Sequence, residues 1–246
     1  MIFITFQGSK VKYSKYICPI LQKFIDDNKI KTYIEPFVGG ANIIKNIKCI
    51  KRFGLDNNPH LIALWEHLQA NPNFEFPPYP SREDWDKCKN SKEERDWYIG
   101  LVSIFCSNMA GGFPAGYDKM GLRYNGRIKN CQKDLPLLKD VIFECEDYKN
   151  ILLNSHNTLL YCDPPYANTH KYNYQKFDSE EFWQWAREQS KNNYVFVSEQ
   201  EAPEDFTSIW SLDIKHNIRG NTRIATENLF IYENGMVKKY ISQTEN

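Results

Sequence analysis

Short apolar runs that end in polar or glycine residues recur along this chain, and helical patterns follow several of them. The runs lie at 31–40, 50–58, 140–148, 158–166 and 193–200. Helices are expected over 41–47, over 59–69, where Pro59 suits a first turn, and over 178–190, where Asp178 is the expected N-cap. Strands that alternate with helices predict an α/β fold with a doubly wound, mostly parallel sheet.

The alternation of apolar runs and helical patterns stops between about residues 71 and 140. Residues 71–90 are proline-rich and look irregular, and a helix is expected over 93–109. Turn signals at Tyr117-Asp118 and Asn125-Gly126 then predict a β-hairpin. We therefore expect two domains: a core formed by 1–70 and 141–246, and a mainly helical inserted subdomain at 71–140. The tail over 211–235 is expected to form two strands around an Arg-Gly-Asn turn.

Composition narrows the class of protein. The chain has 246 residues, 41% of them hydrophobic, which is enough to bury a core. Lys+Arg and Asp+Glu each total 31, so net charge indicates no partner, but basic residues gather at 10–52 and 119–133, where a polyanion could bind. Seven cysteines without a CxxC pair favour reduced thiols over disulfides or a zinc site. No signal peptide or membrane-spanning run is found, so we expect a soluble cytoplasmic protein.

Three strand ends carry groups suited to a nucleoside. In an open α/β sheet, ligands bind outside the carboxyl ends of the strands. Gly39 and Gly40 follow the first strand and would let the backbone approach a ligand. Asp56 ends the second strand, near the offset of ~20 residues expected of an acid that binds ribose hydroxyls, and Asp147 follows the third. GxGxxG is missing, so the predicted ligand needs no pyrophosphate; an ordinary helix-start turn is the alternative interpretation.

The fourth strand end is a stiff corner. Asp163 and Pro164 each precede a proline, which favours extended backbone. Neither Pro164 nor Pro165 has an N–H to donate. The corner would present the Asp163 carboxylate and the Pro164 carbonyl as paired acceptors beside the ring of Tyr166. This arrangement suits a planar group with an NH2, such as a nucleobase, whereas the alternative is a turn with a solvated aspartate.

The motifs DPPY at 163–166 and EPFVGG at 35–40 resemble those of the Dam-like, D12 class of DNA adenine-N6 methyltransferases. The resemblance spans nearly the whole chain, although Gly8-Ser9-Lys10 replaces the more usual Gly-Gly-Lys. It implies a Rossmann-like methyltransferase fold that binds S-adenosylmethionine. The implied cofactor-binding residues are Gly8, Lys10, Pro36, Phe37, Gly39, Gly40, Asp56, Asn57, Asp147, Tyr148 and Asp163, and the implied catalytic residues are Asp163, Pro164 and Tyr166.

The resemblance also implies a reaction: methyl transfer to the N6 amino group of an adenine flipped out of duplex DNA. Hydrogen bonds from N6 to Asp163 and Pro164 would return electron density to that weak nucleophile. Flipping costs a few kcal/mol, of which stacking on Tyr166 would return ~1–3 kcal/mol. No metal and no covalent enzyme intermediate are expected.

The segment 112–131 is the expected DNA-reading element. Arg123, Tyr124, Asn125 and Arg127 would surround a tight turn that reaches base edges. Lys119, Lys129 and Lys133 would anchor phosphates, which positions the protein without specifying sequence. A basic hairpin with purely structural aromatics is the alternative interpretation.

Other functions stay open at this stage. Methylation of RNA or protein glutamine is one, although those relatives more often begin the tetrapeptide with Asn and lack such an insert. Cytosine-N4 methylation is another, for which Ser is the commoner first residue, and a catalytically silent DNA-binding module is a third. We expect a restriction-modification, orphan or phage enzyme, nucleoid-associated, and a monomer or a weak dimer on DNA.

Overall fold

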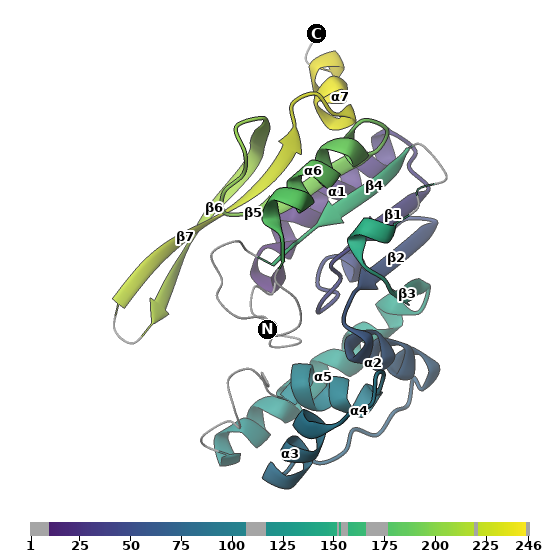
Figure 1. The fold of residues 1–246 in the computed structure, drawn as a ribbon, viewed down its shortest axis with the longest axis vertical. Helices are drawn as coiled ribbons and strands as arrows, with labels where there is room; N and C mark the ends of the chain where they lie inside the picture. Colours follow the sequence, from purple (N-terminus) through teal and green to yellow (C-terminus); the bar gives the residue numbers. More distant parts are fainter. Residues whose placement is uncertain are drawn as a thin grey trace.

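The computed structural model describes residues 10–106, 117–151, 153, 157–165, 177–218 and 221–244. In this part of the chain the strands form one seven-stranded sheet with the order β3-β2-β1-β4-β5-β7-β6 (Figure 1). All neighbouring strands from β3 to β5 are parallel, and β7 runs antiparallel to both β5 and β6. The predicted doubly wound α/β fold is confirmed. The strands are β1 (Thr32–Glu35), β2 (Lys51–Asp56), β3 (Val141–Cys145), β4 (Thr158–Cys162), β5 (Tyr194–Glu199), β6 (Phe206–Ile218) and β7 (Asn221–Tyr232).

Helices cover both faces of the sheet. Helices α1 (Ser14–Asp27), α2 (Pro59–Ala70) and α7 (Met236–Thr244) contribute to the cluster on one face, and α6 (Ser179–Ser190) packs on the other. The predicted N-cap is present at Asp178, whose side chain accepts from the first turn of α6. Helix α2 has an N-cap that was not predicted, because the Asn58 side chain accepts from His60 N and Leu61 N. The helix expected over 41–47 is only a single 3-10 turn, η2 (Ile44–Asn46).

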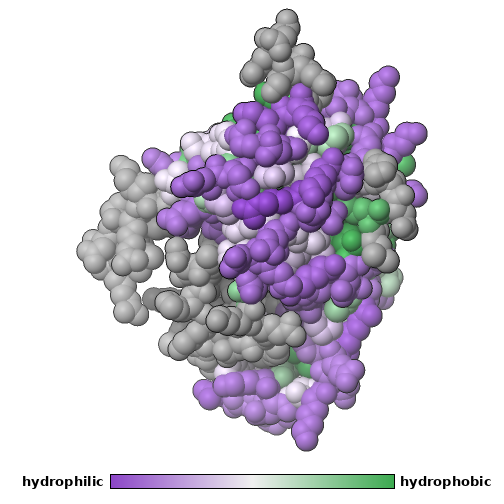
Figure 2. Space-filling view, turned by 45° about the horizontal axis from the view of Figure 1, so that its top comes forward, coloured by the Kyte–Doolittle hydropathy of each residue, from purple (hydrophilic) through white to green (hydrophobic). Residues whose placement is uncertain are grey.

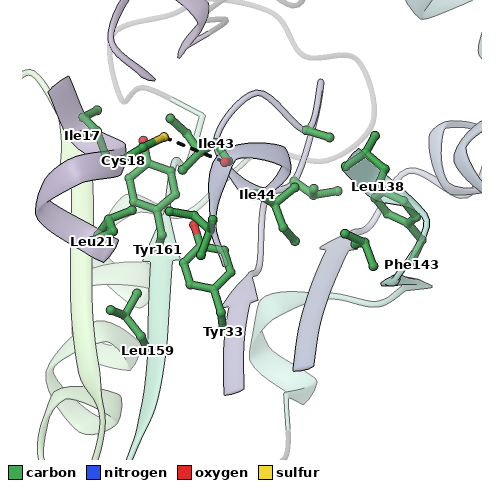
Figure 3. Packing of buried hydrophobic residues seen from close by; sticks show 14 of the residues in the cluster. Ile17, Cys18, Leu21, Tyr33, Ile43, Ile44, Leu138, Phe143, Leu159 and Tyr161 are labelled. Atoms are coloured by element: carbon green, nitrogen blue, oxygen red, sulfur yellow. Dashed lines mark hydrogen bonds between the residues drawn. The ribbon is translucent and has the colours of Figure 1, made fainter. Parts of the chain in front are cut away.

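Successive residues of the central strands point to opposite faces, so both helical layers hold the strands in place. On one face, Ile17 and Leu21 of α1 pack against Tyr33, Leu159 and Tyr161 (Figure 3). All five side chains are at most 1% exposed, and each such burial contributes about 1.5–3 kcal/mol. In Figure 3 the Cys18 thiol points to the carbonyl oxygen of Ile43, with 3.9 Å between the sulfur and the oxygen. Ile43 lies in the loop between β1 and η2, so this contact joins α1 to that loop. The packing therefore fixes the strand ends that carry the candidate site.

The segment between β2 and β3 is helical, but the predicted hairpin is wrong. It contains α3 (Arg82–Asn90), α4 (Trp97–Gly100), the π-helical turn η3 (Leu101–Cys106) and the long helix α5 (Tyr117–Leu138), which runs through Asn125-Gly126. Burial explains the difference. Tyr124, Cys131 and Leu138 lie on one helical face and are at most 2% exposed, which outweighs the ~1 kcal/mol cost of a glycine within a helix.

Helix α3 lies in the part of the segment expected to be irregular. Ser81 and Asp84 form a capping box, in which the Ser81 hydroxyl accepts from Asp84 N and the Asp84 carboxylate accepts from Ser81 N. Trp85 and Cys88 of this helix pack with Ile99 and Val102 into a small cluster separate from the main core. The helical segment thus has a core of its own, while α5 also joins the main core.

The predicted pair of strands in the tail is confirmed as the β6–β7 hairpin. Only three residues of β7, Asn228–Phe230, pair with β5, so most of the hairpin projects beyond the sheet (Figure 1).

The surface of the described residues is mostly hydrophilic on the face that Figure 2 shows, and the hydrophobic residues on that face form small groups. The six cysteines whose side chains the structure describes are free, and no described helix is long and apolar enough to cross a membrane.

Candidate active site

The strand ends singled out by the sequence meet at one edge of the sheet. Parallel neighbours lie about 4.7–4.9 Å apart, and the order β3-β2-β1-β4 places their carboxyl ends side by side. Asp147 follows β3, Asp56 ends β2, Gly39 follows β1 and Asp163 follows β4. The β1–β4 boundary, where the chain changes direction across the sheet, is the place where open α/β sheets bind ligands.

The loop after β1 is held by its neighbours. Gly39 has a φ of 44°, a left-handed conformation that glycine adopts without strain. Its N–H donates to Asp56 Oδ2 over 3.2 Å, and its carbonyl oxygen accepts from Trp65 Nε1 over 3.0 Å. Pro36 and Gly40 are buried, and Phe37 and Gly39 are half-buried. The loop is therefore pre-shaped, with backbone atoms at the strand ends.

Asp56 is a half-buried carboxylate with spare acceptor capacity. Besides the Gly39 N–H it accepts from the backbone N–H of Asn58, at 3.0 Å, which leaves two of its roughly four lone-pair directions. Burial raises the pKa of Asp56 to about 6, against the two N–H groups that lower it. The Asn57 side chain is exposed beside it. Such a group can accept from a pair of hydroxyls.

Aromatic rings follow the ends of the neighbouring strands β1 and β3. The Phe37 ring is 5.3 Å from that of Tyr148, in η5 (Tyr148–Asn150), and 6.0 Å from that of Phe177. Tyr148 is buried, and its hydroxyl has no hydrogen-bond partner among the described residues. Asp147, only partly buried, accepts from Lys149 N with one oxygen. Hydroxyl acceptors, a glycine loop and aromatic rings beside a further carboxylate fit a nucleoside cofactor.

At the corner after β4, Asp163 is bound to a buried lysine. Lys10, in η1 (Lys10–Lys12), places Nζ 2.8 Å from Asp163 Oδ1, and the two side chains are 2% and 23% exposed. Burial raises the pKa of Asp163 to about 6, although Lys10 opposes this shift. Burial alone would lower the pKa of Lys10, but the neighbouring carboxylates outweigh it and the pKa is raised. Pro164 is buried and Pro165 half-buried, so this corner does not face bulk solvent.

Five residues that the sequence analysis did not single out complete this site. Glu227 Oε1 lies 3.1 Å from Lys10 Nζ and accepts from the Ser198 hydroxyl over 2.6 Å. Glu35 accepts from the Tyr33 hydroxyl over 2.7 Å. Burial raises the pKa of Glu35 and of Glu199 to about 8. Ser198 and Glu199 could have been predicted, because they are polar residues at the end of the apolar run at 193–200. Glu227 lies in an antiparallel strand, and the sequence pattern of that strand does not mark it as a site residue.

Other predicted residues lie elsewhere. Gly8 and Tyr166 are outside the described residues, as are the side chains of Lys119 and Arg123 on α5. Tyr124 and Arg127 do not surround a turn, because they lie on the buried face of α5, where the Tyr124 hydroxyl donates to the Pro77 carbonyl. Asn125 and Lys129 are exposed, one helical turn apart.

Comparison with known proteins gives a family match over most of the chain. A family model described as D12 class N6 adenine-specific DNA methyltransferase matches residues 6–99 and 106–198. The chain is 23% identical over 191 residues to the type II methyltransferase M.FokI of Planomicrobium okeanokoites, covering 68% of this chain. It spans about 29% of the length of that relative.

Solved structures show more distant likeness. One is named as an RNA methyltransferase from Pyrococcus horikoshii, with a TM-score of 0.41, 9% identity, and coverage of 89% of this chain and 81% of that one. Another is named as a methyltransferase in complex with SAH, with a TM-score of 0.38, 12% identity, and coverage of 92% and 54%. Similarity at this level carries no argument about substrate.

Proposed function

The chain belongs to the D12 class of N6 adenine-specific DNA methyltransferases, with S-adenosylmethionine as methyl donor, and on that premise we propose what it does with DNA. It methylates the N6 amino group of adenine at particular sequences in duplex DNA, after the target base has flipped out of the helix. The observation that carries the proposal is the Asp163 carboxylate, held by buried Lys10 at the DPPY corner beside the Gly39 loop.

The chemistry follows from which oxygen atoms of the DPPY corner are already bound and which can accept from the substrate. Lys10 occupies Oδ1 of Asp163, which leaves Oδ2 to accept from one N6–H, and the Pro164 carbonyl would accept from the other. Two acceptors return electron density to a nitrogen whose lone pair is otherwise shared with the ring. The cofactor supplies an electrophilic methyl group. As the new C–N bond forms, the C–S bond that holds the methyl group on the cofactor would break, and its electron pair would stay on the sulfur of the departing cofactor product. N6 would lose a proton, and Asp163, with a pKa of about 6, is basic enough to receive it.

The cofactor would lie along the strand ends from β1 to β3. Asp56 and Asn57 would bind the ribose hydroxyls, and Asp147 with Tyr148 would hold the adenine ring. Pro36, Phe37, Gly39 and Gly40 would shape the methionine end, together with Gly8 and Lys10. Asp56 supports this assignment most directly, because it is half-buried, accepts a hydrogen bond from Gly39 and retains free lone pairs.

The inserted segment 71–140 is proposed to recognise the target sequence. Helix α5 presents Asn125, Lys129 and Lys133 at four-residue spacing on its exposed face, so all three point to one side. Lysines on such a face suit DNA phosphates, and an asparagine suits an adenine edge. Lys119 and Arg123 precede them on the same helix, and Tyr166 is proposed to stack on the flipped base.

Methylation of a random-sequence duplex library with labelled S-adenosylmethionine tests the proposal. The modified bases are mapped and the modified nucleoside is identified by mass spectrometry. The proposal expects N6-methyladenine at a recurring sequence. Label in RNA, in protein or on cytosine N4, with none on adenine in duplex DNA, would overturn it.

A further inference from the structure

We propose that Glu227 is a positioning residue of this active site, which shares the Lys10 ammonium with Asp163 and so keeps Asp163 a strong hydrogen-bond acceptor. The inference deepens the proposed function and rests on it, because it assigns a role at the same corner. Glu227 lies outside the DPPY and EPFVGG motifs and comes from a strand at the far end of the chain.

The geometry leaves Glu227 little freedom. Its Oε1 lies 3.1 Å from Lys10 Nζ and accepts from Ser198 Oγ over 2.6 Å. Lys10 is 2% and Glu227 3% exposed, so this contact is shielded from water. Buried charges persist only when they are paired and hydrogen-bonded, and here the ammonium, the hydroxyl and the two carboxylates satisfy one another.

The electrostatic effect of this sharing on Asp163 has a definite sign. An ammonium bound to Asp163 alone would lower its proton affinity and weaken it as an acceptor for N6–H. Glu227 raises the pKa of Asp163, because a nearby negative charge makes it less favourable for Asp163 to be ionised. With Glu227 in place, Lys10 can orient Asp163 without drawing off the electron density that the reaction needs.

Other titratable groups also face Asp163. They are Tyr13 beside η1, Glu35 of β1, Tyr161 and Cys162 of β4, and Glu199 of β5. Burial raises the pKa of each of them, to about 8 for Glu35 and Glu199, so all five are mainly neutral near pH 6. A titration near pH 6 at this corner therefore reports on Asp163 and on the charges of Lys10 and Glu227.

The strand that carries Glu227 also forms the projecting hairpin. Glu227 is paired with Leu212 of β6, and the next residue, Asn228, is paired with Glu199 of β5. The residue thus sits where β7 leaves the sheet to become part of a two-stranded ribbon. Anchoring by Lys10 and Ser198 at this point ties the base of the hairpin to the catalytic corner.

Substitution Glu227→Gln tests the proposal, because it keeps an oxygen for Lys10 and Ser198 and removes the charge. The first readout is the titration midpoint of the Asp163 carboxyl, followed by ¹³C NMR in the protein without cofactor or DNA. The second is the acid limb of the pH profile of kcat. Both are expected to move to lower pH, by about one unit, with kcat at pH 8 reduced roughly tenfold.

Ser198→Ala provides the opposite shift and a second route if Glu227→Gln does not fold. Without the hydroxyl donor, the negative charge of Glu227 is less screened and repels that of Asp163 more strongly, so the Asp163 midpoint is expected to rise. Glu188→Gln, at an exposed glutamate of α6, is the matched control and should leave the midpoint unchanged. An unmoved midpoint in both variants, even with a lower Tm, would reduce Glu227 to a structural role and overturn the proposal.

The two proposals fail in different ways. If the wild-type protein methylates no DNA adenine, the proposed function fails, while the NMR titration without substrate still decides the role of Glu227. If methylation occurs and the midpoint does not respond to either variant, the role of Glu227 fails alone.

Discussion

The ammonium of Lys10 lies 2.8 Å from the carboxylate of Asp163, so the segment that opens the described chain reaches into the corner after β4. Lys10 is almost fully buried there, and its position is fixed by two carboxylates. The pair orients Asp163 with one oxygen bound and the other available. The predictions below follow from this arrangement and from the neighbouring strand ends.

Replacing Lys10 by Gln is expected to move the acid limb of methyl transfer to higher pH, by about one unit or more. Lys10 lowers the pKa of Asp163, so its removal favours the protonated form, which cannot accept from N6–H. Rates measured from pH 5 to 9 should show partial recovery at the alkaline end. The matched control is Lys12→Gln, an exposed lysine of the same turn. A uniform loss of rate at every pH would contradict this role.

Replacing Asp56 by Asn is expected to weaken S-adenosylmethionine binding by roughly 10- to 100-fold, because hydrogen bonds to a charged group contribute about 1.5–3 kcal/mol. Isothermal titration calorimetry measures this change, with Glu144→Gln at the exposed side of β3 as control. Binding to the wild-type protein should also weaken as pH falls through about 6, where Asp56 becomes protonated. DNA affinity should change little, and a larger loss for DNA than for the cofactor would argue against the assignment.

Glu35 is expected to make the protein less stable as pH rises. Its folded pKa of about 8 lies above the ordinary value of 4.5, so the folded state binds the proton more tightly. This stabilisation is complete below about pH 4.5 and is lost as pH rises through 8. Tm measured from pH 5 to 9 should fall by several degrees more in the wild type than in Glu35→Gln. Parallel curves would show that Glu35 does not carry the effect.

The exposed lysines of α5, Lys129 and Lys133, are expected to contribute to DNA affinity without setting sequence preference. Lys129→Ala and Lys133→Ala should each weaken binding to all duplexes alike and reduce the slope of log K against log salt by about 0.9. Fluorescence anisotropy at several salt concentrations measures the slope, with exposed Lys92→Ala as control. Unchanged slopes in both variants would remove this face from the DNA interface.

Arg127, predicted from the sequence to read bases, is expected to act through stability instead. It is 7% exposed on the buried face of α5, so Arg127→Ala should lower the free energy of unfolding by roughly 1–3 kcal/mol. Denaturation in urea tests this directly. Sequence preference, mapped with the same random library, should stay unchanged, and a relaxed preference at full stability would restore the original prediction.

The sheet and its ligand-binding edge could be predicted because local signals agreed with the global fold. Asp56, Asp163 and Gly39 each stand directly after an apolar run, and parallel strands must bring such positions to one edge. The N-cap Asp178 and the first-turn Pro59 likewise act over a few residues and could be recognised in the sequence.

The missed features depend on distant contacts. Asn125-Gly126 has the strongest local preference for a hairpin turn, but the helix that contains it buries Tyr124 and Cys131 against other elements. Glu227 reaches Lys10 because β7 enters the sheet antiparallel beside β5, which no pattern within 221–232 indicates. A role that depends on contacts between residues far apart in the chain cannot be predicted from the nearby sequence alone.

The most direct test of the catalytic corner is single-turnover methyl transfer by Asp163→Asn beside the wild type, with cofactor and DNA affinities measured on the same samples. Asn keeps the size of the side chain and loses the anionic acceptor. We predict a fall in the transfer rate of roughly 10²–10³-fold with both affinities within a few-fold of the wild type. Near-normal transfer by Asp163→Asn would contradict the account.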